Sequence, residues 1–113
     1  MIPLTRQKCA PCEGGVPSLS RAKAEELLAQ TPGWIMDDDA KKIRRQFKFK
    51  DFKEAMVFVN KVGDLAESEN HHPDFAIFWN RVRLDLWTHA INGLFTNDFI
   101  LAAKINEIEP PKI

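Results

Sequence analysis

The chain lacks several features that mark common protein classes. Its sixteen basic and sixteen acidic side chains cancel, so it has no broad positive surface of the kind that drives nucleic-acid binding. No apolar run approaches the roughly 20 residues that a membrane span needs, and the N-terminus opens no secretory signal with a long hydrophobic region. We therefore expect a cytoplasmic protein that makes no direct contact with nucleic acid or membrane.

Cysteine is nearly absent, and its two copies, Cys9 and Cys12, form one Cys-x-x-Cys sequence near the N-terminus. A single pair cannot fill the usual four-ligand shell of structural zinc. A thioredoxin-like redox pair belongs in a βαβ unit, whereas this pair precedes every periodic segment. The alternatives are a redox pair, half of a zinc site, or a tail without essential chemistry, and the setting favours the last.

The chain does contain enough apolar residues for one core, since 44% of its 113 residues are hydrophobic and eight of them are Phe. This predicts a single domain at residues 18–113 behind a flexible N-terminal tail at residues 1–17. Ser18 or Ser20 is placed to cap a first helix, which a Thr-Pro-Gly sequence at 31–33 ends.

Two alternating segments and a long amphipathic stretch follow. A short strand is predicted at 34–36 and a second at 41–50, where apolar and polar side chains alternate. Asp51 is placed to cap a long helix that ends before Pro73. The apolar residues of this helix recur every three or four positions: Phe52, Ala55, Met56, Val59, Val62 and Ala66. Phe58 and Leu65 widen the stripe, which indicates either an oligomer interface or a deeply buried helix.

The last third of the chain predicts a hairpin and a final helix. Residues 75–79 and 82–88 read as two strands joined at Asn80-Arg81, and a helix starts at Thr96 or Asn97. The complete order is helix, two strands, helix, two strands, helix. It predicts an α+β fold, a four-stranded antiparallel sheet with three helices packed on one face.

All three histidines, His71, His72 and His89, fall within nineteen residues. Histidine is the side chain whose unperturbed pKa of about 6.5 suits proton transfer near neutral pH. If Asn80 and Arg81 form a two-residue loop, His72 lies opposite His89, and directly opposed residues have Cβ atoms roughly 4.5 to 5.5 Å apart. The sequence therefore predicts one site for acid and base chemistry.

One ordered series of residues resembles the signature of pterin-4a-carbinolamine dehydratases. The series reads Glu67-x3-His71-His72-Pro73-x5-Trp79-x9-His89-x8-Asp98. The resemblance implies dehydration of 4a-hydroxytetrahydrobiopterin to quinonoid dihydropterin, which recycles tetrahydrobiopterin after aromatic amino acid hydroxylation. It also implies a homodimer or homotetramer, a functional link to an aromatic amino acid hydroxylase, and no metal or organic cofactor.

The resemblance also assigns roles to residues. It implies that His71, His72 and His89 are catalytic, with His71 and His89 exchanging protons with the substrate and His72 holding and polarising it. The implied pterin contact surface consists of Asn70, His71, His72, Trp87, Thr88, His89 and Ala90. Asn70 occupies a position where relatives often have Asp, and Trp87 one where smaller residues occur.

Four residues of the series and its surroundings also have structural interpretations. Glu67, near the end of the long helix, is expected to be structural, and a bond to a histidine is the alternative. Trp79 and Trp87 are expected to pack, although Trp87 lies on the side of His89, where it would wall a pterin ring. Asp98 is expected to stabilise a helix start rather than act as a catalytic base.

Two other functions compete with the dehydratase. A zinc site of three imidazoles is one, but His71 and His72 are adjacent and point to opposite sides of an extended chain. The other is a non-enzymatic dimerisation or assembly protein, or a transcriptional coactivator, because relatives of the family include such proteins. The presence of all three histidines favours the enzyme.

Overall fold

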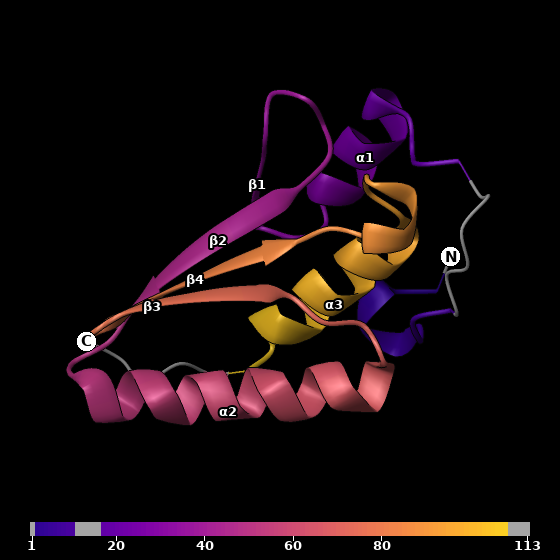
Figure 1. The fold of residues 1–113 in the computed structure, drawn as a ribbon. Helices are drawn as coiled ribbons and strands as arrows, with labels where there is room; N and C mark the ends of the chain where they lie inside the picture. The colour runs from indigo at the N-terminus through magenta and orange to yellow at the C-terminus, as the bar shows by residue number, and fades with distance from the viewer. Residues whose placement is uncertain (1, 11–16, 109–113) are drawn as a thin grey trace.

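The computed structural model describes residues 2–10 and 17–108 and contains one sheet with helices on one side of it (Figure 1). Its elements are η1 (Leu4–Arg6), α1 (Arg21–Leu28), β1 (Ile35–Met36), β2 (Ile43–Lys48), α2 (Phe52–Glu69), β3 (Asp74–Phe78), β4 (Arg81–Leu86), η2 (His89–Ile91) and α3 (Thr96–Asn106). All neighbouring strands are antiparallel, in the order β1-β2-β4-β3. The helix α2 runs along the sheet, α3 contacts α2, and α1 packs on α3. The predicted fold class is confirmed.

The helices begin where the sequence predicts them. The side chain of Ser20 accepts a hydrogen bond from the backbone N–H of Lys23 at 3.2 Å. Asp51 does the same for the N–H of Glu54 at 2.9 Å. Each cap satisfies one of the N–H groups that the first turn of a helix leaves unpaired. The local sequence is therefore sufficient to start α1 and α2.

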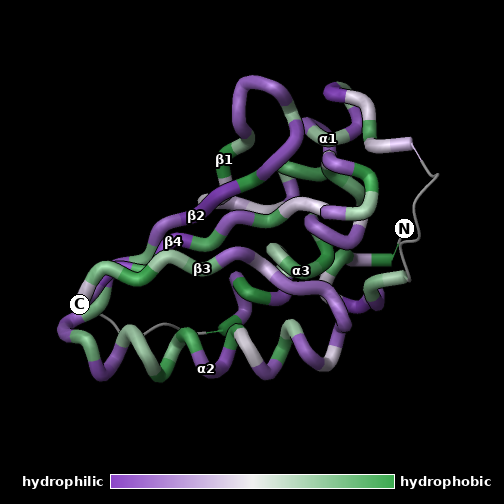
Figure 2. Tube along the Cα trace, viewed as in Figure 1, coloured by the Kyte–Doolittle hydropathy of each residue, from purple (hydrophilic) through white to green (hydrophobic). Residues whose placement is uncertain are grey.

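Alternation along the two central strands builds the core. In β4, Val82 and Leu86 are fully buried, and they pair with the buried Phe47 and Ile43 of β2. Ala55, Phe58 and Val62 of α2 belong to the same core cluster, and Ala66 is also buried on this helix. Apolar and polar positions alternate along α2 in Figure 2, as the period of a half-buried helix requires. Phe52, the first residue of the predicted stripe, is 47% exposed and lies outside this core.

The hairpin of β3 and β4 has a different loop from the predicted one. Phe78 pairs with Arg81, so the two loop residues are Trp79 and Asn80. Asn80 is held from outside the hairpin, because its Nδ2 donates to the backbone oxygen of Phe49 at 3.0 Å and its own backbone oxygen accepts from the Phe49 N–H at 2.8 Å. A contact from a distant segment therefore sets the position of the turn.

This shift corrects the predicted pairing of His72 with His89. The strand β3 begins at Asp74 and β4 ends at Leu86, so both histidines lie outside the paired strands. The prediction of direct opposition is wrong. The loop moves by one residue, so the partner of each β3 residue moves by two positions along β4, and residues that were predicted to share a face still do.

The N-terminal residues lie against the helical layer. Leu4 is 5% exposed, and η1 contacts α3. The flexibility of residues 1–17 and the domain boundary that follows them stay predictions, and Cys12 lies outside the described residues. Within the described part of the chain, no helix is both long enough and apolar enough to cross a membrane.

Candidate active site

His71 lies in the turn that connects α2 to β3. Asn70 ends the helix in the left-handed conformation, with φ 53° and ψ 39°, a common way for a chain to leave a helix. The backbone N–H of His71 still donates to the carbonyl of Ala66 at 3.2 Å, and Pro73 prevents the helix from continuing. The imidazole of His71 is only 11% exposed.

The partner of His71 is Asp98, in the first turn of α3. The carboxylate of Asp98 is fully buried, and its Oδ1 lies 2.6 Å from Nε2 of His71. Its Oδ2 accepts from the hydroxyl of Thr88 at 2.8 Å and from the backbone N–H of Phe95 at 3.0 Å. Three donors hold the carboxylate in one orientation. Asp98 therefore stabilises a helix start, as expected, and also orients His71, which sequence reasoning missed.

This hydrogen bond determines which nitrogen of His71 can act as a base. A carboxylate only accepts hydrogen bonds, so Nε2 carries the proton that it donates to Asp98. In the neutral ring, Nδ1 is then the free base. A proton taken up at Nδ1 produces an imidazolium whose Nε2–H still donates to Asp98.

The second part of the site follows β4 directly. The rings of Trp87 and His89 meet edge to face, with their centroids 4.0 Å apart and their planes at 89°. Nε1 of Trp87 donates to Oδ2 of Asp74 at 2.9 Å. Oδ1 of Asp74 lies 3.8 Å from Nε2 of His89, which is beyond hydrogen-bond distance but within range of an ion pair. Asp74 thus holds the indole and faces the imidazole.

The third histidine and its neighbours are open to solvent. Nε2 of His72 lies 2.6 Å from Oε1 of Glu67, and these side chains are 51% and 79% exposed. Of the two interpretations of Glu67, the bond to a histidine is therefore present. Ala90 is also exposed, within η2.

Comparison with known proteins decides the family. Residues 17–108 match the family model described as pterin 4 alpha carbinolamine dehydratase. The chain belongs to this dehydratase family. A Methylococcus capsulatus protein with the provisional name pterin-4-alpha-carbinolamine dehydratase is 50% identical over 105 residues, which cover 93% of this chain and 92% of that one.

Two further relatives extend the comparison. Pterin-4-alpha-carbinolamine dehydratase 2, mitochondrial, of Arabidopsis thaliana is 44% identical over 110 residues, which cover 94% of this chain and 59% of that protein. A crystal structure of a transcriptional coactivator/pterin dehydratase from Brucella melitensis aligns with a TM-score of 0.74 and 37% identity, over 79% of this chain and 95% of that one. The solved structure has the same fold.

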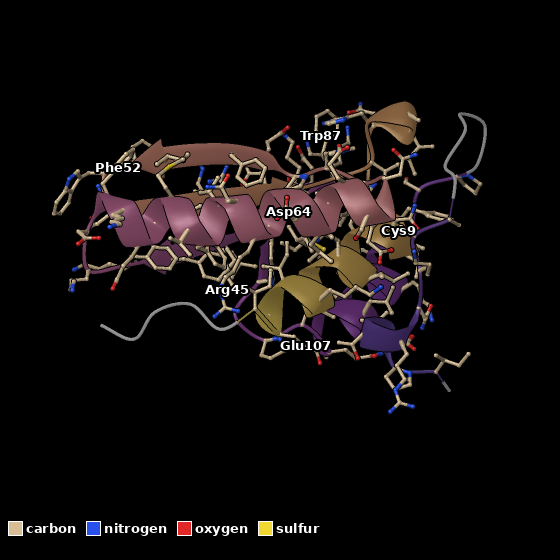
Figure 3. The ribbon with its side chains drawn as sticks, turned by 90° about the horizontal axis from the view of Figure 1, so that it is seen from below. Cys9, Arg45, Phe52, Asp64, Trp87 and Glu107 are labelled. Atoms are coloured by element: carbon tan, nitrogen blue, oxygen red, sulfur yellow. The ribbon has the colours of Figure 1, made fainter. Side chains whose placement is uncertain are left out.

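In this member of the dehydratase family, the predicted site residues occupy two connections, 70–73 and 87–91. The hydrogen bonds of Asp98 join them, because this carboxylate contacts both His71 and Thr88. Figure 3 shows Trp87 near the C-terminal end of α2, the end that leads into the first connection. Sequence reasoning missed Asp74, although its position directly after the His-His-Pro sequence was a signal that it faces the same site.

In the part of the chain that the structure describes, neither a metal-binding cluster nor the hollow described below coincides with this site. Among the described residues, which include all three histidines, no group of three or more His, Cys, Asp or Glu side chains is arranged to hold a metal ion. A hollow of about 550 Å³ has none of the predicted site residues in its lining. It is lined by Thr5, Lys61, Asp64, Leu65, Lys104, Glu107 and Ile108.

Proposed function

We propose that this protein dehydrates 4a-hydroxytetrahydrobiopterin to quinonoid dihydropterin. In this reaction the C4a–O bond breaks, N5 loses its proton, and a double bond forms between N5 and C4a, so that the products are the quinonoid pterin and one water. An acid must protonate the leaving hydroxyl, and a base must take the N5 proton. Two imidazoles that contact the same pterin ring can supply this acid and this base. The proposed step uses no metal and no organic cofactor.

The contact between His71 and Asp98 carries the proposal. It joins a histidine that is 11% exposed to a carboxylate that is fully buried, at 2.6 Å. This arrangement leaves Nδ1 as the proton acceptor and keeps the ring in one orientation. We therefore assign the removal of the N5 proton to His71, with Asp98 as its positioning residue.

His89 is suited to the complementary role. Its side chain is 56% exposed, so the ring is in contact with solvent, and its Nε2 lies 3.8 Å from the carboxylate of Asp74. We assign protonation of the leaving hydroxyl to His89. The edge-to-face contact with Trp87 fixes one side of the imidazole, and the indole offers an apolar wall for the pterin ring.

The remaining predicted residues are assigned to substrate binding, with the exception of Thr88. His72 and Asn70 are exposed in the first connection, where their polar groups can hold and polarise the pterin. Thr88 is 3% exposed, and its hydroxyl is already bonded to Asp98, so its contribution is to link the two connections. Ala90 adds no bulk where the ring would enter.

A stopped-flow dehydration assay with synthetic 4a-hydroxytetrahydropterin tests the proposal. We expect His71→Ala and His89→Ala each to lower kcat by about 10²- to 10⁴-fold, the usual contribution of a positioned acid or base. His72→Ala is the matched neighbouring change and should mainly raise KM. Unchanged rates in all three variants would rule out the mechanism, and stoichiometric zinc in the purified protein would favour the metal alternative.

Oligomer formation and location are part of the same proposal. Apolar side chains of the edge strand β3 stay exposed, with Phe75 and Ile77 at 38% and Phe78 at 49%. Surfaces of this kind are commonly covered by a second copy, so we propose a homodimer or homotetramer in the cytoplasm. The substrate also links the protein to an aromatic amino acid hydroxylase, which generates the 4a-hydroxypterin. Sedimentation velocity of the parent protein tests the oligomeric state.

A role as a transcriptional coactivator or assembly protein is the second candidate. The observation that favours it is the exposure of Phe52 and Val57 on α2, at 47% and 45%. A partner helix could cover them. Under this alternative, Phe52→Ser with Val57→Ser abolishes partner binding while dehydration persists. Conversely, His71→Ala should lose dehydration and keep partner binding, which would show that the two roles use different residues.

A further inference from the structure

A short N-terminal segment, residues 4–10, crosses the protein beside the C-terminal end of α2, and we call it the strap. Leu4 anchors it in the core with 5% exposure. The backbone N–H of Cys9 donates to Oε1 of Glu69 at 2.9 Å. Glu69 is the last residue of α2 and lies two positions before His71. Figure 3 shows Cys9 at this end of the helix.

The next residue of the strap holds the start of α3. The N–H of Ala10 donates to Oδ1 of Asn97 at 2.8 Å, and Nδ2 of Asn97 donates to the carbonyl of Ala10 at 2.6 Å. This reciprocal pair permits only one register of the strap. Asn97 is 2% exposed and directly precedes Asp98. Two consecutive strap residues therefore hold the chain two positions before His71 and one position before Asp98.

The groups that receive the strap are also bonded to each other. Nζ of Lys104 in α3 lies 2.6 Å from Oε2 of Glu69, and the two side chains are 15% and 4% exposed. Burial alone would raise the pKa of Glu69, but the hydrogen bonds from Lys104 and from the Cys9 N–H outweigh it and lower the pKa. Glu69 therefore stays ionised and keeps both bonds at neutral pH.

The thiol of Cys9 takes part in the same contact. Burial, reinforced by the negative charge of Glu69, raises the pKa of Cys9 to about 12. The group stays a thiol, and its Sγ lies 3.5 Å from the backbone oxygen of Asn97, to which it donates. A thiol that remains protonated is a poor nucleophile and metal ligand. The role of Cys9 in this structure is therefore structural.

We propose that the strap positions His71 against Asp98. The 2.6 Å contact between them depends on the separation of the end of α2 from the start of α3, and the strap is hydrogen-bonded to both of these ends. Misplacement of a catalytic group by about 1 Å can lower a rate by about 100-fold. The effect on rate rests on the proposed dehydration, but the hydrogen bond itself is observable without substrate. Asn97 and Ala10 are positioning residues.

Two full-length variants test the strap. Asn97→Ala removes both side-chain bonds to Ala10, and Ala10→Pro removes the N–H that donates to Asn97 and also restricts the backbone at residue 10 and at the preceding Cys9. We expect kcat to fall about tenfold in each, with KM changed less than about twofold, because binding groups stay in place. The downfield NMR resonance of the His71 Nε2 proton, measured without substrate, should broaden or disappear in both. The double variant should be no worse than the worse single one, since both act through one contact.

Val62→Ala provides the matched control. Val62 is fully buried in the middle of α2, about two turns before the strap contact. If Val62→Ala lowers the melting temperature as much as the strap variants do, it should still keep the kcat and the His71 resonance of the parent protein. The proposal would be overturned if Val62→Ala lost kcat and the His71 resonance to the same extent as the strap variants. An unchanged resonance in both strap variants would also overturn it. If Asn97→Ala does not fold, Ala10→Pro decides alone. A parent protein without dehydratase activity whose resonance still depends on the strap would contradict the proposed function and support the positioning.

Discussion

Each of the three histidines faces a carboxylate, but the pairs differ in burial. His71 and Asp98 are 11% and 0% exposed and lie 2.6 Å apart. The His72 pair has the same separation of 2.6 Å, yet its members are 51% and 79% exposed. Water and salt screen an exposed pair, whereas a buried carboxylate has no substitute for its protein donors. Equal distances therefore do not imply equal energies, and only the first pair is expected to have a fixed geometry.

The largest expected effect comes from Asp98→Asn. Three donors converge on this carboxylate, and an amide in its place directs an NH₂ group at one of them. Breaking a buried pair of this kind is expected to lower the free energy of unfolding by about 3 kcal/mol. Because His71 loses its orientation, kcat should fall about 100-fold or more. Urea unfolding and stopped-flow dehydration measure the two effects.

Asp74→Asn is the matched control for that prediction. Asp74 is 52% exposed and also faces a histidine, but its oxygen lies 3.8 Å from His89. An amide oxygen can still accept the bond from Trp87, so the stability change should stay below about 0.5 kcal/mol. If Asp74→Asn destabilised the protein as much as Asp98→Asn, burial of the carboxylate would not explain the difference in stability between the two histidine–carboxylate pairs.

Glu69→Gln should have an intermediate effect that depends on pH. The pKa of Glu69 in the folded protein is lowered from 4.5, since the bonds from Lys104 and Cys9 outweigh the effect of burial. Its contribution to stability is thus complete above pH 4.5 and is lost as the pH falls through the lower, folded pKa. We expect Glu69→Gln to cost about 2 kcal/mol at neutral pH.

Urea unfolding of the parent and of Glu69→Gln at a series of pH values measures this difference. The gap between the two proteins should narrow as the solution becomes more acidic than the ordinary pKa of a glutamate. Lys61→Gln, a change at an exposed position of α2, serves as the control for loss of a single charge. A gap that widens toward acid would show that the folded protein favours the neutral form of Glu69.

The sequence predicted the parts of the structure that depend on neighbours in the chain. The caps at Ser20 and Asp51 are local hydrogen bonds across three residues, and the buried faces of β2 and β4 follow from an alternation that only Arg45 interrupts in these two strands. Both signals lie within one element. For this reason the element order and the fold class could be predicted without coordinates.

The parts that the sequence did not predict depend on distant partners. The hairpin loop is shifted because Asn80 bonds to Phe49, which lies 31 positions earlier. The orientation of His71 is set by Asp98, 27 positions later. A carboxylate in the first turn of a helix already has a local explanation, so although Asp98 belongs to the series that carries the resemblance, no local pattern indicated its contact with His71. Both features depend on contacts between residues far apart in the sequence, which local patterns do not encode.

The smallest expected effect comes from Glu67→Gln, in the exposed pair with His72. The pair with His72 is short, but Glu67 is 79% exposed, so we expect less than about 0.5 kcal/mol of stability and less than a twofold change in kcat or KM. His72→Ala, by contrast, should raise KM, because on our proposal His72 acts through the substrate and not through Glu67. A steady-state comparison of the two variants at low and high salt distinguishes the roles. A rise in KM for Glu67→Gln as large as that for His72→Ala would show that an exposed carboxylate can orient a histidine in this site as firmly as a buried one.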